Sequence, residues 1–110
     1  IAESLGVTLP NASCIPAVVS EHSRLAVATG RKAVELATNQ MTPLSFLTRD
    51  HFENALITQL TLSGSTNAIV HMIAMAGRAG IRLTLDDYDR ISRDIPVLAD
   101  LRPSGRFLME

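Results

Sequence analysis

The stretch best suited to chemistry is Ser63-Gly64-Ser65-Thr66-Asn67, where small polar residues stand directly before an apolar run. A helix that began here would present backbone N–H groups with no partners inside the helix, and such groups attract anions, for example carboxylates. Ser65 or Thr66 could instead act as a simple N-cap, because a hydroxyl oxygen accepts a hydrogen bond from one of those groups. The spacing alone leaves both interpretations open, an anion-binding turn and a structural cap.

The other reactive side chains lack the spacing of a metal or nucleophilic site. His22, His51 and His71 lie far apart, and Cys14 is the single cysteine, so the close ligand pairs of a zinc site are missing. We expect His51 in the first turn of a helix and His71 as a hydrogen-bonded core residue. Cys14 could be a nucleophile, although a small packed side chain is the commoner case.

An acidic cluster follows later, formed by Asp86, Asp87 and Asp89. It lacks the spacing and the glycine of a calcium-binding loop. Thr84 and Asp87 occupy the first and fourth positions of a capping box, and negative charge stabilises a helix N-terminus. We therefore interpret the cluster as structural.

The elements that must position these residues are mainly helices. Apolar periodicity and end signals predict a helix over residues 17–38, a second from the Thr48 cap to about Ser63-Gly64, a third ending at Gly80, and a short one after Thr84. Ile1–Leu5 is expected to be a final helical turn that ends at Gly6, and Pro16 to stand just inside the start of the first helix. The packed face of that helix is expected to comprise Ala26, Thr29, Gly30, Ala33, Leu36 and Ala37.

The third helix is apolar on almost every side. Ile69, Met72, Ile73 and Ala76 form one face, and apolar residues fill much of the rest, which is typical of a helix buried between layers. Short strands are expected at 81–83 and 95–101. The fold class predicted is α/β, as a helix-rich piece of a layered domain with no complete second domain.

Composition limits the partners. The 110 residues are 46% hydrophobic and 19% charged, with a net charge of −1 and 4% aromatics. This balance predicts a globular chain and gives no electrostatic or stacking basis for binding nucleic acid or an anionic membrane. No apolar run is long enough to span a membrane. The chain opens on Ile1, and we expect it to be an interior segment of a longer cytoplasmic protein.

Several segments, taken in order, resemble the family that includes dihydroxy-acid dehydratase, phosphogluconate dehydratase and the aldonic-acid dehydratases. The resemblance covers the whole chain and implies an α/β/α layered N-terminal domain. It is carried by Glu3–Pro10, Ile15–Val18, Ala28–Arg31, Phe52–Ala55, Gly64-Ser-Thr-Asn-Ala68, Leu83–Asp87 and Pro96–Gly105.

The resemblance implies a hydro-lyase that removes water from a 2,3-dihydroxy acid and yields a 2-keto acid through an enol. Family members use an iron–sulfur cluster and Mg²⁺, which suits the chemistry because a Lewis acid assists departure of the hydroxyl group. They also form homo-oligomers. The resemblance leaves two substrate classes, a sugar acid and a branched-chain dihydroxy acid. The segments Ser13–Val18 and Ala76–Gly80 look more like the sugar-acid members of the family.

Some sequence signatures of the family are missing from this chain, which limits the roles that its residues can be assigned. The Cys-Asp-Lys and Thr-Asp-Gly-Arg signatures are absent from these residues, and Cys14 matches no cluster ligand. We therefore assign no catalytic residue and no metal ligand here, and expect the chain alone to be inactive.

The resemblance implies that Ser65, Thr66 and Asn67 line the substrate or metal pocket, with residues 11–15 as a second candidate. In the familiar motif a glycine precedes Gly64, and here it is Ser63. The competing interpretations are a non-catalytic helical module that binds a partner and a degenerate, inactive relative.

Overall fold

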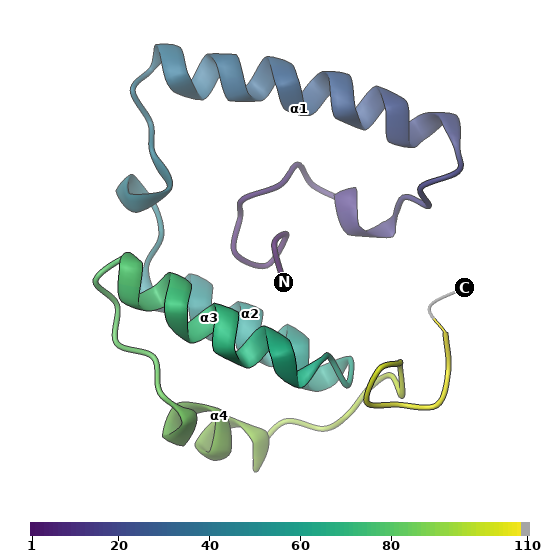
Figure 1. Ribbon diagram of the computed structural model, residues 1–110, viewed down its shortest axis with the longest axis vertical. Helices are drawn as coiled ribbons and strands as arrows, with labels where there is room; N and C mark the ends of the chain where they lie inside the picture. Colours follow the sequence, from purple (N-terminus) through teal and green to yellow (C-terminus); the bar gives the residue numbers. More distant parts are fainter. Residues whose placement is uncertain (109–110) are drawn as a thin grey trace.

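The computed structural model describes residues 1–108, and their regular structure is helical (Figure 1). Four α-helices and two short 3-10 helices follow one another along the chain. In order they are η1 (Ala12–Cys14), α1 (Ser20–Thr38), η2 (Pro43–Ser45), α2 (Arg49–Thr61), α3 (Thr66–Arg78) and α4 (Leu85–Ser92).

The strands expected at 81–83 and 95–101 do not form within residues 1–108. Both segments are free of helix, but only one isolated bridge, between Leu101 and Phe107, is present. A strand requires a neighbouring strand along which its backbone N–H and C=O groups pair repeatedly, and neither segment has such a neighbour within residues 1–108. The helical part of the α/β prediction is confirmed, and the strand assignments are wrong for the described residues.

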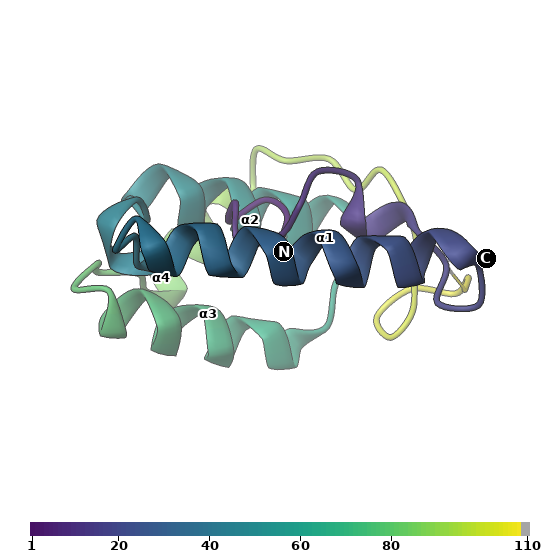
Figure 2. The same cartoon turned by 90° about the horizontal axis from the view of Figure 1, so that it is seen from above.

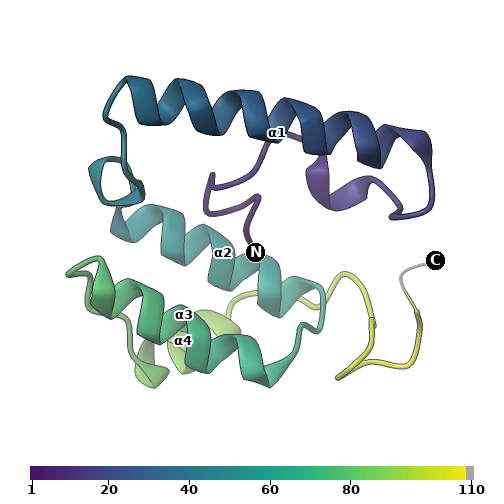
Figure 3. The same ribbon diagram turned by 45° about the horizontal axis from the view of Figure 1, so that its top comes forward.

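The core lies between α2, α3 and α4, which Figure 3 shows grouped together. Phe52, Leu56 and Met72 are the largest fully buried side chains. Burial of each such side chain contributes about 1.5–3 kcal/mol, so this small group dominates the stability of the unit. The full set of buried apolar residues is Leu5, Phe52, Ala55, Leu56, Met72, Ala76, Leu83, Tyr88 and Ile91.

Helix α1 lies apart from that core in Figure 1, and in the view from above it runs across the front of the molecule (Figure 2). None of its residues is buried. On the face that was expected to pack, Leu36 is half-buried and the other five residues are exposed. The described chain measures only 19 Å across its thinnest dimension, which is less than two helix diameters. The prediction of a packed small-residue face is wrong here because no other helix lies against that face.

Helix α3 is covered on one side only. Met72 and Ala76 are buried, whereas Val70 is 68% exposed and Met75 is 43% exposed. His71 is also exposed, so its assignment as a core residue is wrong. A helix that is apolar all round needs neighbours on both sides, and within residues 1–108 it has them on one.

The ends of the helices largely follow the sequence signals. The Thr48 N–H donates to His51 Nδ1 at 3.3 Å in the first turn of α2, as expected of His51. Gly80, with φ +72°, follows the end of α3, and Gly6, with φ +74°, ends the first turn. Helix α1 begins at Ser20, three residues later than expected, because residues 16–19 form a separate turn. None of the helices described here is long and apolar enough to cross a membrane.

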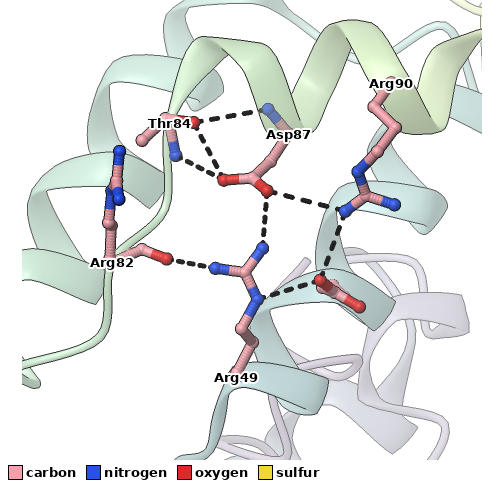
Figure 4. A network of polar contacts seen from close by, with 6 residues as sticks. Arg49, Arg82, Thr84, Asp87 and Arg90 are labelled. Atoms are coloured by element: carbon pink, nitrogen blue, oxygen red, sulfur yellow. Dashed lines mark hydrogen bonds and ion pairs between the residues drawn. The ribbon is translucent and has the colours of Figure 1, made fainter.

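A network of ion pairs attaches α4 to α2 (Figure 4). The Arg49 guanidinium lies 2.6 Å from Asp87 and 3.0 Å from Glu53, and it also donates to the Arg82 carbonyl. Arg90 lies 3.5 Å from Asp87 and 3.6 Å from Glu53. The same Asp87 carboxylate completes the expected capping box, accepting from the Thr84 N–H and hydroxyl at 2.9 Å each. The structural interpretation is therefore confirmed for Asp87.

These contacts make stability depend on pH in the acid range. The Thr84 N–H, the Arg49 guanidinium and the Thr84 hydroxyl lower the pKa of Asp87 from 3.8 to about 2. Because the folded-state pKa is depressed, the stabilisation is complete above about pH 4 and disappears as pH falls through 2. We expect Asp87→Asn to cost about 1–2 kcal/mol near pH 7 and almost nothing at pH 2, as measured by urea unfolding.

The matched control is Asp86→Asn, which removes an equal charge from an exposed position in the same turn. We expect it to change stability by less than about 0.5 kcal/mol at either pH. A cost of Asp87→Asn that stayed constant from pH 7 to pH 2 would contradict the assignment of the network as the source of the acid dependence.

Candidate functional site

The turn between α2 and α3 contains the residues singled out by the sequence. Ser63 has a left-handed backbone with φ +54°, and the Gly64 N–H donates to the Gln59 carbonyl at 2.8 Å. Ser65 is the N-cap of α3, and its hydroxyl accepts from the Asn67 N–H at 3.3 Å. The capping interpretation is therefore confirmed for Ser65, while Thr66 and Asn67 are exposed in the first turn.

A buried glutamine lies beneath this turn. Gln59 is 4% exposed, and its Nε2 donates to the Ser65 carbonyl at 2.8 Å. Its Oε1 accepts from the Tyr88 hydroxyl of α4 at 3.3 Å. The glutamine also limits Gly64, because a Cβ atom there would lie 2.8 Å from Gln59 Cγ and 3.0 Å from its carbonyl oxygen.

The segment near residue 100 adjoins the same turn. The N–H groups of Leu98 and Ala99 donate to the Thr61 carbonyl at 2.8 and 3.0 Å. The Ser104 hydroxyl donates to the Gly64 carbonyl at 3.2 Å. Two of the segments that carried the family resemblance, Gly64–Ala68 and Pro96–Gly105, are thus in direct contact although they lie about 40 residues apart in sequence.

The second candidate segment, residues 11–15, lies elsewhere and is held by Glu3. Its carboxylate accepts from the Asn11 N–H at 2.5 Å, and from the Ser13 N–H and hydroxyl at 3.0 and 2.5 Å. These hydrogen bonds, chiefly the one from the Ser13 hydroxyl, lower the pKa of Glu3. Cys14 in this segment is exposed, so the interpretation as a packed side chain is wrong.

An apolar hollow of the described chain lies away from the Gly64–Asn67 turn and includes none of its residues. It is an apolar cavity of about 460 Å³ between α1 and the segments before and after it, where residues such as Val7, Leu36 and Phe46 line it. No group of three or more His, Cys, Asp or Glu side chains is placed to bind a metal ion among the residues that the structure describes.

Three of these contacts were not anticipated, those of Gln59, Ser104 and Glu3. A signal was available for Gln59: it shares one helical face with Phe52, Ala55 and Leu56, and a polar residue on an apolar face must find buried partners. Ser104 and Glu3 gave no comparable signal, because their partners lie in other segments, 40 residues away for Ser104 and 8 to 10 residues away for Glu3.

The Ser63 backbone allows a test of the turn. A left-handed conformation costs a residue other than glycine about 1–2 kcal/mol, partly offset by the greater freedom of glycine in the unfolded chain. We expect Ser63→Gly to raise stability by up to about 1 kcal/mol, seen as a higher melting temperature. Ser23→Gly, at an exposed position in the first part of α1, should instead lower it by about 0.5 kcal/mol. Equal losses in both variants would show that Ser63 carries no strain.

Comparisons with known proteins agree with the resemblance. The family model for the N-terminal part of dihydroxy-acid/6-phosphogluconate dehydratases matches residues 1–110. The chain is 45% identical to an L-arabinonate dehydratase of Rhizobium leguminosarum over 99% of its length, and 48% identical to an L-arabonate dehydratase of Azospirillum brasilense over all of it. It is 43% identical over 98% to a dihydroxy-acid dehydratase of Cytophaga hutchinsonii. It spans about a fifth of each of these relatives, 19% of their length. The chain therefore belongs to the dihydroxy-acid and 6-phosphogluconate dehydratase family, within its N-terminal region.

Proposed function

We propose that this chain is part of the N-terminal α/β/α domain of a hydro-lyase that converts a 2,3-dihydroxy carboxylic acid into a 2-keto acid. The observation that carries the proposal is identity of 43–48% to dehydratases along almost the whole chain. The remainder of a longer polypeptide, and a second copy in a homo-oligomer, would cover the apolar faces that α1 and α3 leave exposed. By itself the 110-residue chain should show no turnover.

Within such an enzyme, the role we propose for Ser65, Thr66 and Asn67 is to line the substrate pocket. The exposed Thr66 and Asn67 side chains lie in the first turn of α3, where the helix dipole favours negative charge such as a substrate carboxylate. The Ser65 cap supports this role, because it fixes the direction in which the first turn leaves the Gly64 turn.

The iron–sulfur cluster and Mg²⁺ of the family do not fit the side chains described here, since residues 1–108 bring no suitable set of ligands together. We therefore propose that their ligands lie outside this segment. Its residues bind and orient the substrate. A cytoplasmic location is also proposed, because a single cysteine leaves no intramolecular disulfide in these residues, as is usual in a reducing compartment.

We propose a sugar acid (aldonate) as the substrate, with a branched-chain dihydroxy acid as the alternative. Two of the relatives named above are dehydratases of arabinonate, and the third is a dihydroxy-acid dehydratase. An assay of the complete, anaerobically purified protein against several aldonates and 2,3-dihydroxyisovalerate separates the two, with keto-acid formation as the measurement.

The same assay tests the pocket. We expect Thr66→Val, which keeps the side-chain shape but removes the hydroxyl, to lower kcat/KM about 10- to 100-fold. This corresponds to the loss of about 1.4–2.7 kcal/mol, as for one hydrogen bond to a charged substrate group. Thr38→Val at the end of α1 should leave kcat/KM unchanged. If kcat/KM of Thr66→Val equals that of the wild type, the turn has only a structural role. No turnover of any acid by the wild-type enzyme would favour the alternative, a non-catalytic helical interaction module or an inactive relative.

A further inference from the structure

We propose that Gln59 is the positioning residue of the Gly64–Asn67 turn, and that its amide sets the orientation of the residues that face the substrate. This inference rests on the function proposed above. Gln59 was not among the site residues expected from the sequence. It is buried beneath the turn, whereas Thr66 and Asn67 are exposed.

The first support is its place in the core. Gln59 is the one buried polar residue among the described residues, at 4% exposure, on the face of α2 that also buries Phe52 and Leu56. A buried amide without partners costs about 1–3 kcal/mol, so an apolar residue would be the simpler choice for packing alone. The hydrogen bonds of the amide therefore give the reason for a polar residue at this position.

The second support is the direction of its hydrogen bonds. The Tyr88 hydroxyl donates to Oε1, so Nε2 faces the Ser65 carbonyl and donates to it at 2.8 Å. That carbonyl also accepts from the Ala68 N–H at 3.0 Å, at the start of α3. The Gln59 amide thus anchors the peptide unit that directly precedes Thr66.

The third support is that the turn is held from both of its sides. The Gln59 carbonyl accepts from the Gly64 N–H, and its Cγ fills the space where a Gly64 side chain would stand. The Ser104 hydroxyl donates to the Gly64 carbonyl from the opposite segment. Ser104 is exposed, so the bond from the buried glutamine is the more rigid of the two constraints.

The experiment compares three variants of the complete enzyme. Gln59→Met keeps the side-chain length but removes both hydrogen bonds, and Gln59→Glu places an acceptor opposite the Ser65 carbonyl. Tyr88→Phe removes only the bond on the Oε1 side and is the matched control. Two quantities are measured in each folded variant at 25 °C, the kinetic constants kcat and KM, and the amide hydrogen exchange of residues 62–68.

We expect both Gln59 variants to lose about 10- to 100-fold in kcat/KM and to exchange amides faster in residues 62–68. Tyr88→Phe should lower the melting temperature but keep the wild-type kinetics and the wild-type exchange of that segment. Lower melting temperatures in all three variants, with unchanged kinetics and unchanged exchange, would overturn the proposal and leave Gln59 as a packing residue.

The exchange measurement separates this inference from the proposed function. If the wild-type enzyme turns over no dihydroxy acid, the dehydratase assignment fails, while faster exchange in Gln59→Met still supports control of the turn. If Thr66→Val loses activity and Gln59→Met does not, the pocket stands and the positioning role fails.

Discussion

Replacing Gly64 with alanine is expected to destabilise the protein by about 1–3 kcal/mol, the usual cost of forcing an extra carbon into a packed site. The added Cβ would meet Gln59 Cγ at 2.8 Å and the Gln59 carbonyl oxygen at 3.0 Å. Neither atom can move freely, because the Gln59 side chain is buried and its carbonyl belongs to α2. Thermal unfolding of the complete protein measures the loss, and kcat/KM should fall with it.

The control is the same substitution made at Gly77, in the last part of α3. A Cβ atom there meets nothing within 4 Å, and alanine is favoured over glycine in a helix by about 1 kcal/mol. We expect Gly77→Ala to raise the melting temperature while Gly64→Ala lowers it. Equal shifts of the same sign would mean that the close approach of Gln59 to Gly64 does not constrain the turn.

Phe52→Ala is expected to give the largest loss of stability, about 3–5 kcal/mol. Phe52 is fully buried and belongs to the single core cluster that α2, α3 and α4 share. Since whole domains are stable by only about 5–15 kcal/mol, this loss should reduce the soluble yield of the variant and lower its unfolding midpoint in urea.

Phe107→Ala provides the comparison, because Phe107 is 60% exposed and has the Arg106 guanidinium 5.5 Å from its ring. We expect a change of at most about 1 kcal/mol, the value of an exposed cation–π contact. A similar loss from both phenylalanines would contradict the placement of the core around α2.

The helices and their caps could be predicted from sequence because the signals are local. Thr48, Ser65, Thr84 and Gly80 each act within four residues of their own position, and all four mark helix ends as expected. The Asp87 cap followed from the same local logic. Predictions of this kind need no knowledge of the tertiary structure.

Predictions that depended on distant neighbours were wrong or incomplete. Apolar periodicity says which face a helix can bury but not whether anything covers it, so the α1 face and His71 were assigned to a core that residues 1–108 do not provide. The two expected strands have no neighbouring strand among the described residues for the same reason. A pocket lined by Ser65, Thr66 and Asn67 would also need residues on its opposite side. Their role in such a pocket therefore stays a prediction.

The core has a consequence for the order of events during synthesis. Eight of its nine buried apolar residues lie between Phe52 and Ile91, and only Leu5 precedes them in the sequence. Contacts so close in sequence form quickly, so the three later helices can assemble soon after Ile91 leaves the ribosome. The segment around Leu5 emerges first but must wait for that assembly before it can dock. During this interval α1 and its apolar residues would be the part of the nascent chain most in need of a chaperone.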